Sequence, residues 1–116
     1  MTHRAALLDY ADDLLDGTVK LGPRAARTAA LFARSAFEDW LDEQNRPWAS
    51  PNGKRAPTAT SKLIALRVQH GAEVGERAKR VWHALSRACH HHAYDLQPSP
   101  SEIRQLITEV RCLETL

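Results

Sequence analysis

Apolar side chains recur at helical spacing along almost the whole sequence, and this periodicity restricts the possible folds more than any other feature. Few stretches alternate between apolar and polar residues as half-buried strands do, and only 6% of the residues are aromatic. The sequence therefore predicts an all-α protein. The first segment illustrates the pattern, because its apolar residues fall on one face of a helix: Leu7, Leu8, Ala11, Leu14 and Leu15.

Glycine and proline divide the helical pattern into segments. Gly17 is suited to the end of the first helix, and Pro23 to the first turn of the second. Three prolines predict a long loop over residues 45–60. Ser99 and Glu102 form a capping box that opens the last helix. The helices that we expect cover residues 3–16, 23–44, 61–70, 72–94 and a final segment from Pro100.

The length of the chain allows one hydrophobic core and no more. A chain of 116 residues buries about two-thirds of its unfolded surface on folding, and neither half of it could bury a core alone. We therefore expect residues 1–116 to form a single domain, an antiparallel bundle of four or five helices.

Composition and charge exclude several classes of protein. No apolar run approaches the ~18 residues of a membrane span, and acidic residues follow the N-terminus too closely for a signal peptide. The two cysteines cannot build a disulfide scaffold. The formal net charge of +2 neither demands nor excludes nucleic acid as a partner. We expect a cytoplasmic protein with no membrane segment.

Three consecutive histidines, His90 to His92, suggest a metal site, but their spacing argues against one. Neighbouring residues on a helix point about 100° apart, so the three side chains cannot reach one ion. His83 and His90 share a helical face, yet they lie roughly 10 Å apart, whereas Zn–N bonds measure about 2 Å. We therefore expect neither a metal nor another cofactor.

Cys89 and the basic residues that follow Gly71 suggest two other interpretations of this region. Cys89 lies beside the apolar stripe of its helix, which favours a buried, inert thiol over a nucleophile. A helix break at Gly71 is compatible with a helix-turn-helix DNA-binding regulator. The second helix of that motif would carry the basic residues Arg77, Lys79, Arg80 and Arg87.

Arg87 and His92 offer a different chemistry, the cleavage of RNA without a metal. RNA supplies its own nucleophile, the 2′-hydroxyl group. The reaction then needs a base for the hydroxyl proton, an acid for the leaving oxygen and a cation for the charge on the phosphate. Histidine exchanges protons near neutral pH, and the planar guanidinium of arginine matches phosphate oxygens. One chain offers one such pair, so a two-fold homodimer would supply both an acid and a base.

The same residues resemble the signature of HEPN domains, which are small helical bundles, frequently dimeric, many of them metal-independent ribonucleases. That signature is an arginine, a short spacer and a histidine near the end of a core helix, and Arg87 and His92 match it with four intervening residues. One branch, the HEPN toxins paired with minimal nucleotidyltransferase antitoxins, adds a tyrosine two residues beyond the histidine, where this chain has Tyr94. The alanine-rich segment from Ala25 to Leu41 also resembles the corresponding HEPN helix.

The resemblance implies a role for each residue. His92 would act as acid and base, Arg87 would hold the phosphate, and Tyr94 would position RNA or be adenylylated by a nucleotidyltransferase partner. Many active HEPN nucleases carry a polar residue directly after the arginine, where this chain has Ala88. A non-catalytic HEPN module that binds a nucleotide or a nucleotidyltransferase is therefore the alternative to an endoribonuclease acting as a toxin or defence effector.

Overall fold

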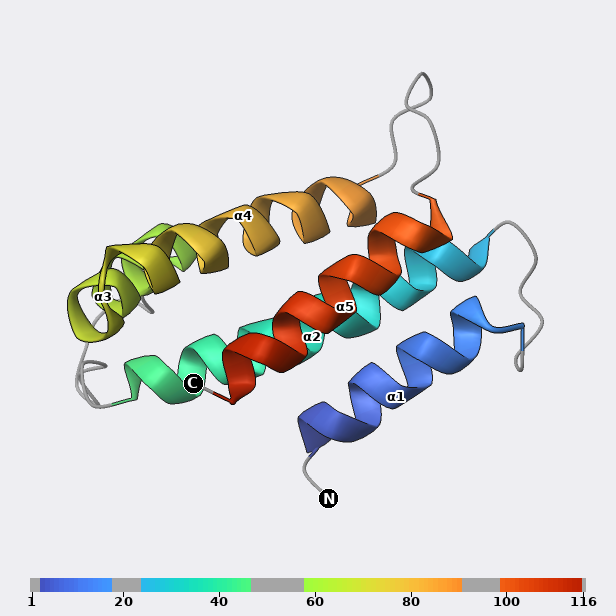
Figure 1. Ribbon diagram of the computed structural model, residues 1–116, viewed down its shortest axis with the longest axis horizontal. Coiled ribbons are helices and arrows are strands. Elements are labelled where there is room, and N and C mark those ends of the chain that lie inside the picture. The colour runs from blue at the N-terminus through green and yellow to red at the C-terminus, as the bar shows by residue number, and fades with distance from the viewer. Residues whose placement is uncertain (1–2, 18–23, 47–57, 91–98, 116) are drawn as a thin grey trace.

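Five α-helices and no strand make up the residues that the computed structural model describes, which are 3–17, 24–46, 58–90 and 99–115 (Figure 1). The expected all-α class is confirmed, as is the expected number of four or five helices. The helices are α1 (His3–Leu15), α2 (Ala25–Asn45), α3 (Ala59–His70), α4 (Ala72–Cys89) and α5 (Pro100–Glu114).

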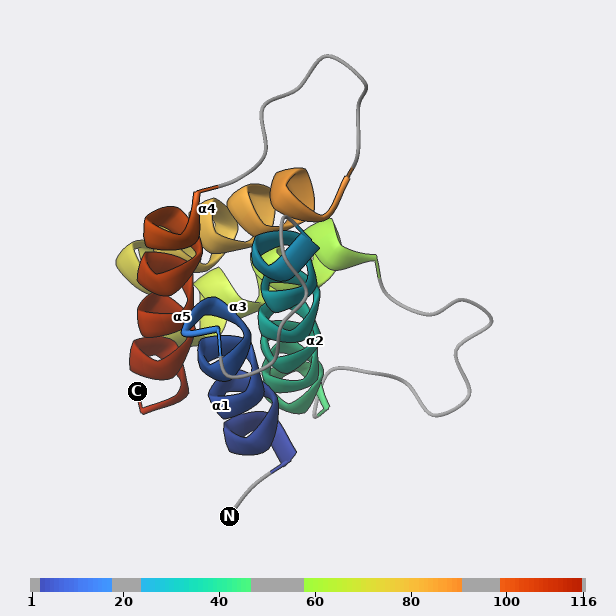
Figure 2. The ribbon, with the colours of Figure 1, turned by 90° about the vertical axis from the view of Figure 1, so that its right-hand side faces the viewer.

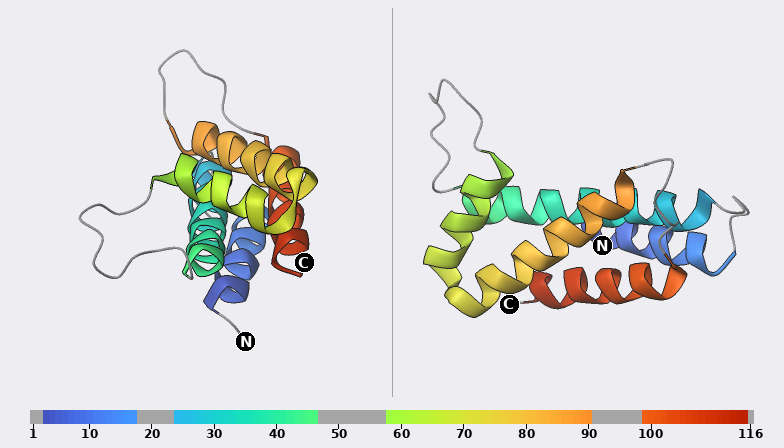
Figure 3. Two further views of the ribbon diagram at one scale, coloured as in Figure 1. Left: turned by 90° about the vertical axis from the view of Figure 1, so that its left-hand side faces the viewer. Right: turned by 90° about the horizontal axis from the view of Figure 1, so that it is seen from above.

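Helix α2 is the centre of the bundle, since it contacts each of the other four helices. Helices α1, α2 and α5 lie side by side, α4 lies across α2 and α5, and α3 crosses the C-terminal end of α2 (Figures 1, 2 and 3). Helix α1 runs antiparallel to both of its neighbours, because Arg4 near its start contacts Asp39 of α2 and Glu114 of α5. Helix α4 is likewise antiparallel to α5, where Arg77 pairs with Glu109.

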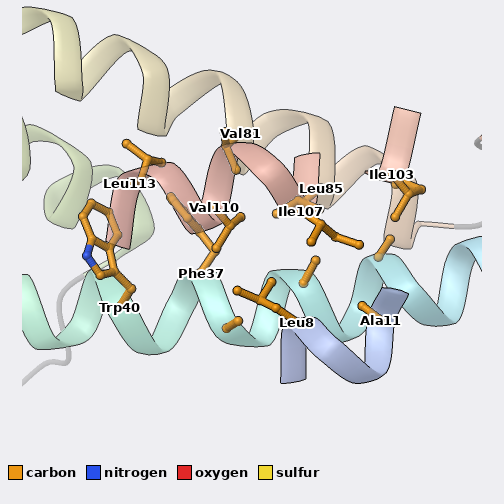
Figure 4. Close-up of a cluster of buried hydrophobic side chains, with 14 of the residues drawn as sticks. Leu8, Ala11, Phe37, Trp40, Val81, Leu85, Ile103, Ile107, Val110 and Leu113 are labelled. Atoms are coloured by element: carbon orange, nitrogen blue, oxygen red, sulfur yellow. The ribbon is translucent and has the colours of Figure 1, made fainter. Parts of the chain in front are cut away.

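The core lies where α1, α2, α4 and α5 meet, and it follows the apolar stripes expected from the sequence (Figure 4). On α2 the buried side of the helix is built from alanines, which let neighbouring helices approach closely, followed by the bulky Phe37 and Trp40. The largest fully buried side chains come from all five helices: Leu8, Leu14, Phe37, Leu41, Leu66, Leu85, Ile103, Ile107, Val110 and Leu113.

Local signals account for most of the helix ends. Gly17 has a positive φ of 79° and follows the end of α1. The Ser99 side chain accepts a hydrogen bond from the Glu102 N–H at the start of α5, 3.2 Å away. The expected end of the first helix at Gly17 and the start of the last helix after Ser99 are confirmed. Between α3 and α4, Gly71 has a φ of 100°, so the expected break is a true change of direction and not a bend within one helix.

The second helix ends, and the third begins, within two residues of the expected positions. Helix α3 begins at Ala59 rather than Ser61, because Thr58 serves as its N-cap and accepts a hydrogen bond from the Ser61 N–H at 3.1 Å. Helix α2 extends to Asn45, whose buried amide donates to the Lys62 carbonyl at 3.2 Å and so joins α2 to α3. Pro23 and most of the expected loop lie outside the described residues.

Among the helices described, none is long and apolar enough to cross a membrane.

Candidate functional site

Arg87 lies in the last turn of α4 with its side chain exposed to solvent. A positive charge at the C-terminal end of a helix interacts favourably with the helix dipole, which gives the residue a structural role. The ion pairs found within the described ranges involve Lys62 and other arginines, so the Arg87 guanidinium is not neutralised by a described carboxylate. It is therefore able to bind an external anion.

Helix α4 ends at Cys89 and not at Tyr94, so the expected helix over residues 72–94 is too long. The backbone of His90 is extended, with φ −80° and ψ 136°, while its N–H still donates to the Ser86 carbonyl at 3.2 Å. Beyond Cys89 the sequence offers histidines where a longer helix would need apolar residues to bury. In globular proteins most helical stability comes from packing an apolar face, so the sequence gives little support for further helical turns here.

This helix end separates the two residues that define the expected site. On one continuous helix, Arg87 and His92 would point about 140° apart. Because α4 ends between them, the helix does not impose that angle. His92 and Tyr94 themselves lie outside the described residues.

The exposed side of α4 is strongly basic towards its C-terminal end. From Arg77 to His90 the sequence has no acidic residue. Four exposed side chains on this stretch form what we name the α4 basic face: Lys79, Arg80, His83 and Arg87. Within the described part of the chain, no carboxylate forms an ion pair with any of these four residues. Such a face suits a polyanion such as a nucleic-acid backbone.

Arg77 does not belong to this face, although the sequence places it among the basic residues of α4. Its guanidinium pairs with Glu109 of α5 at 3.3 Å, and its side chain is largely covered. The opposite side of α4 is buried in the core, at Ala78, Val81, Leu85 and Ala88.

A second cluster joins α4 to α2 beside the basic face. The Arg34 guanidinium carbon lies 4.7 Å from the centroid of the Trp82 ring, in a cation–π contact. Phe37 stacks near the same ring with centroids 6.2 Å apart. Cys89 is half-buried at this junction, and burial raises the pKa of its thiol although the nearby Arg34 guanidinium acts in the opposite direction. A thiol with a raised pKa is a poor nucleophile, which agrees with the inert role expected for Cys89.

A groove of about 280 Å³ opens between α3 and α4, and the sequence pattern did not point to it. The two helices are close at Gly75, where an added Cβ atom would lie 2.6 Å from the Arg67 Cβ atom. The signal that could have indicated such a surface is the number of apolar residues on α3, of which Ile64 and Val68 remain 61% and 74% exposed. The groove is lined by Thr60, Leu63, Ile64, Arg67, Gly75, Glu76, Lys79, Trp82 and His83.

Within the described ranges, no cluster of three or more histidine, cysteine, aspartate or glutamate side chains is arranged to hold a metal ion.

Comparisons of the chain with protein-family models, with curated proteins and with solved structures found no match. The resemblance to HEPN domains therefore depends on the residues of the motif and on the chemistry that they could perform.

Proposed function

We propose that this protein is a metal-independent endoribonuclease of the HEPN type, a cytoplasmic toxin or defence effector that cleaves RNA through the 2′-hydroxyl of its substrate. The observation that carries the proposal is the end of α4 at Cys89, between Arg87 and His92. Arg87 is exposed in the last turn of α4, and α4 does not include the position of His92. Arg87 in the described structure is also free of ion pairs with carboxylates.

In the proposed reaction, a histidine takes the proton of the 2′-hydroxyl, and the oxygen attacks the adjacent phosphorus. A bond from the 2′-oxygen to phosphorus forms, the bond from phosphorus to the 5′-oxygen breaks, and a second histidine gives the leaving oxygen its proton. The products are a 2′,3′-cyclic phosphate and a 5′-hydroxyl. Arg87 would stabilise the extra charge on the phosphate oxygens in the transition state.

Two histidines in these roles require two copies of the chain. We therefore include in the proposal a two-fold homodimer in which both Arg87/His92 pairs face one cleft. Tyr94 would position the RNA beside this cleft, or would be the residue that a nucleotidyltransferase partner modifies to silence the enzyme. Exposure of Arg87 at the end of α4 is compatible with such an arrangement.

The test compares RNA cleavage by the parent protein with that of variants at the motif. His92→Ala should lower the rate by about 10²- to 10⁴-fold, and Arg87→Ala by about 10²- to 10³-fold. Arg87→Lys keeps the charge at the helix end but loses the two-pronged hydrogen bonding, so it should remain as stable as the parent and still cleave poorly. His90→Ala and His91→Ala serve as controls and should cleave normally.

A specific observation favours the alternative, a non-catalytic HEPN module that binds a nucleotide or a nucleotidyltransferase. Ala88, which follows the arginine, is packed into the core and offers no polar group to the site. If the parent protein binds RNA or a nucleotide but cleaves none, and all four alanine variants behave alike, the non-catalytic function replaces the enzyme. Tight binding to duplex DNA in the same assay would favour the DNA-binding regulator.

A further inference from the structure

The groove between α3 and α4 combines an apolar wall with a basic rim. The right-hand view of Figure 3 shows that α3 and α4 meet at the turn between them and diverge from there. The wall includes Leu63 and Ile64 from α3 and Trp82 from α4. Trp82 is held in place by Arg34 and Phe37 of α2, so this part of the wall is fixed before any ligand arrives. A preformed apolar surface of this kind binds flat apolar groups well.

Ile64 leaves apolar surface on the wall of the groove open to a ligand. Its side chain is 61% exposed although it lines a concave surface. At about 280 Å³ the groove is smaller than the sites of drug-sized ligands, which span roughly 300–1,000 Å³. It suits one small planar group rather than a folded partner.

The charges on the rim select the kind of ligand. Lys79 and His83 line the groove and also belong to the α4 basic face. The one acidic side chain of the lining, Glu76, is already paired with Arg67 at 3.2 Å. The groove thus presents unpaired positive charge beside an apolar wall, which complements a group that is flat and apolar on one side and anionic on the other.

The groove also continues the candidate catalytic surface. His83 lies one helical turn before Arg87 on the exposed side of α4, a rise of about 6 Å along the axis. A polyanion held along the α4 basic face would therefore reach both Arg87 and the groove.

We propose that the α3–α4 groove binds one unstacked nucleobase of single-stranded RNA, while Lys79 and His83 hold the phosphate next to that base. The proposal rests on the proposed function, because it makes the groove the substrate-selecting part of the same surface. It implies that single-stranded RNA binds better than duplex RNA, since a paired base cannot leave its stack to enter the groove without an energetic cost.

The experiment measures binding to the intact protein by fluorescence anisotropy with a 2′-O-methyl oligonucleotide, which lacks the nucleophile and cannot be cleaved. Ile64→Ser should weaken binding of the single strand by about tenfold. Val68→Ser is the matched control, because Val68 is also exposed on α3 but does not line the groove. Its affinity should stay within about twofold of the parent.

Two further measurements separate base contacts from phosphate contacts. An oligonucleotide of the same length with abasic sites should bind the Ile64→Ser variant and the parent equally. Lys79→Ala should weaken binding of both oligonucleotides and lower the salt dependence of the affinity by about one phosphate contact.

The outcomes distinguish the two proposals. If the parent binds no RNA, the proposed function fails together with the groove. If the parent binds RNA but Ile64→Ser and Val68→Ser lose equal affinity, or duplex and single strand bind alike, the groove proposal is wrong and the ribonuclease proposal stands. If light scattering shows that Ile64→Ser converts a dimer to a monomer, the groove is occupied by a second copy of the chain instead of a base.

Discussion

Gly75 of α4 lies directly against Arg67 of α3, with so little space that a Cβ atom on the glycine would stand 2.6 Å from the Arg67 Cβ atom and 3.0 Å from its Cα atom. The contact sets the separation of the two helices and, with it, the width of the groove between them. Because the contact involves the Arg67 Cα atom, a change of side-chain rotamer cannot relieve it. A glycine inside a helix is ordinarily unfavourable, but at Gly75, in the first turn of α4, packing requires it.

Gly75→Ala is therefore expected to destabilise the protein. Alanine favours the helix by up to about 1 kcal/mol, but forcing a methyl group into a filled contact costs about 1–3 kcal/mol. The packing cost should exceed the gain in helix formation. The melting temperature should then fall by a few degrees, ~4 °C for each kcal/mol of lost stability in a domain of this size. Thermal unfolding followed by circular dichroism measures the shift. A melting temperature equal to or above that of the parent would show that α3 and α4 move apart freely.

Glu43 and Glu114 contact the same arginine, but removing their charges should change the stability of the protein in opposite directions. Arg4 forms a hydrogen bond with Glu43, which lowers the pKa of that carboxyl. Glu114 lies 3.4 Å from Arg4, but burial, aided by the nearby Asp39 and Glu43, raises the pKa of the Glu114 carboxyl. The ionised form of Glu43 is thus stabilised by folding, whereas the ionised form of Glu114 is penalised by it.

The sign for each residue follows from linkage. Glu43 contributes stability above its unfolded pKa, and this is lost as the pH falls through the lowered folded pKa. Glu114 contributes stability below its unfolded pKa, and this is lost as the pH rises through the raised folded pKa. At pH 7, Glu43→Gln should lower the urea midpoint of unfolding and Glu114→Gln should raise it or leave it unchanged. At pH 3 both differences should shrink, and equal losses from the two variants at pH 7 would contradict the assignment.

The proposed enzyme is expected to be a homodimer, because one Arg87/His92 pair supplies too few groups for both proton transfers. Light scattering at micromolar concentration should give about twice the chain mass of 13.0 kDa. Mixing the parent protein with an excess of His92→Ala protein should lower cleavage by more than simple dilution, since a mixed dimer keeps only one of the two histidines that the proton transfers need. If the protein is a strict monomer at high concentration, a site shared between two copies is ruled out.

Cleavage of RNA should persist in the presence of a chelator. The proposed mechanism uses the 2′-hydroxyl of the substrate as nucleophile and histidine for the proton transfers, so no step requires a metal-bound water. The measurement is the rate of cleavage before and after dialysis against chelator. Activity that disappears and returns with a single divalent ion would assign the chemistry to a metal instead.

Much of the fold was predictable because its signals are local. The apolar stripes of α2 and α5, the positive φ of Gly17 and the capping hydrogen bond of Ser99 all depend on residues within a turn or two of one another. The end of α4 was not predictable in the same way. The sequence directly after Cys89 carries no glycine or proline that would signal a helix end, yet the backbone of His90 is extended.

The candidate site was likewise predictable only in part. The sequence by itself determined that the chain is helical, which faces are apolar, and that Arg87 and His92 are separated by four residues in a segment rich in histidine. Only the tertiary structure decided that Arg77 is paired with Glu109 while Lys79, Arg80 and Arg87 remain on the exposed side. It also decided where α3 approaches α4 and leaves a groove. The physical reason is that periodicity defines the faces of a helix, whereas its neighbours are set by close packing among segments far apart in the chain.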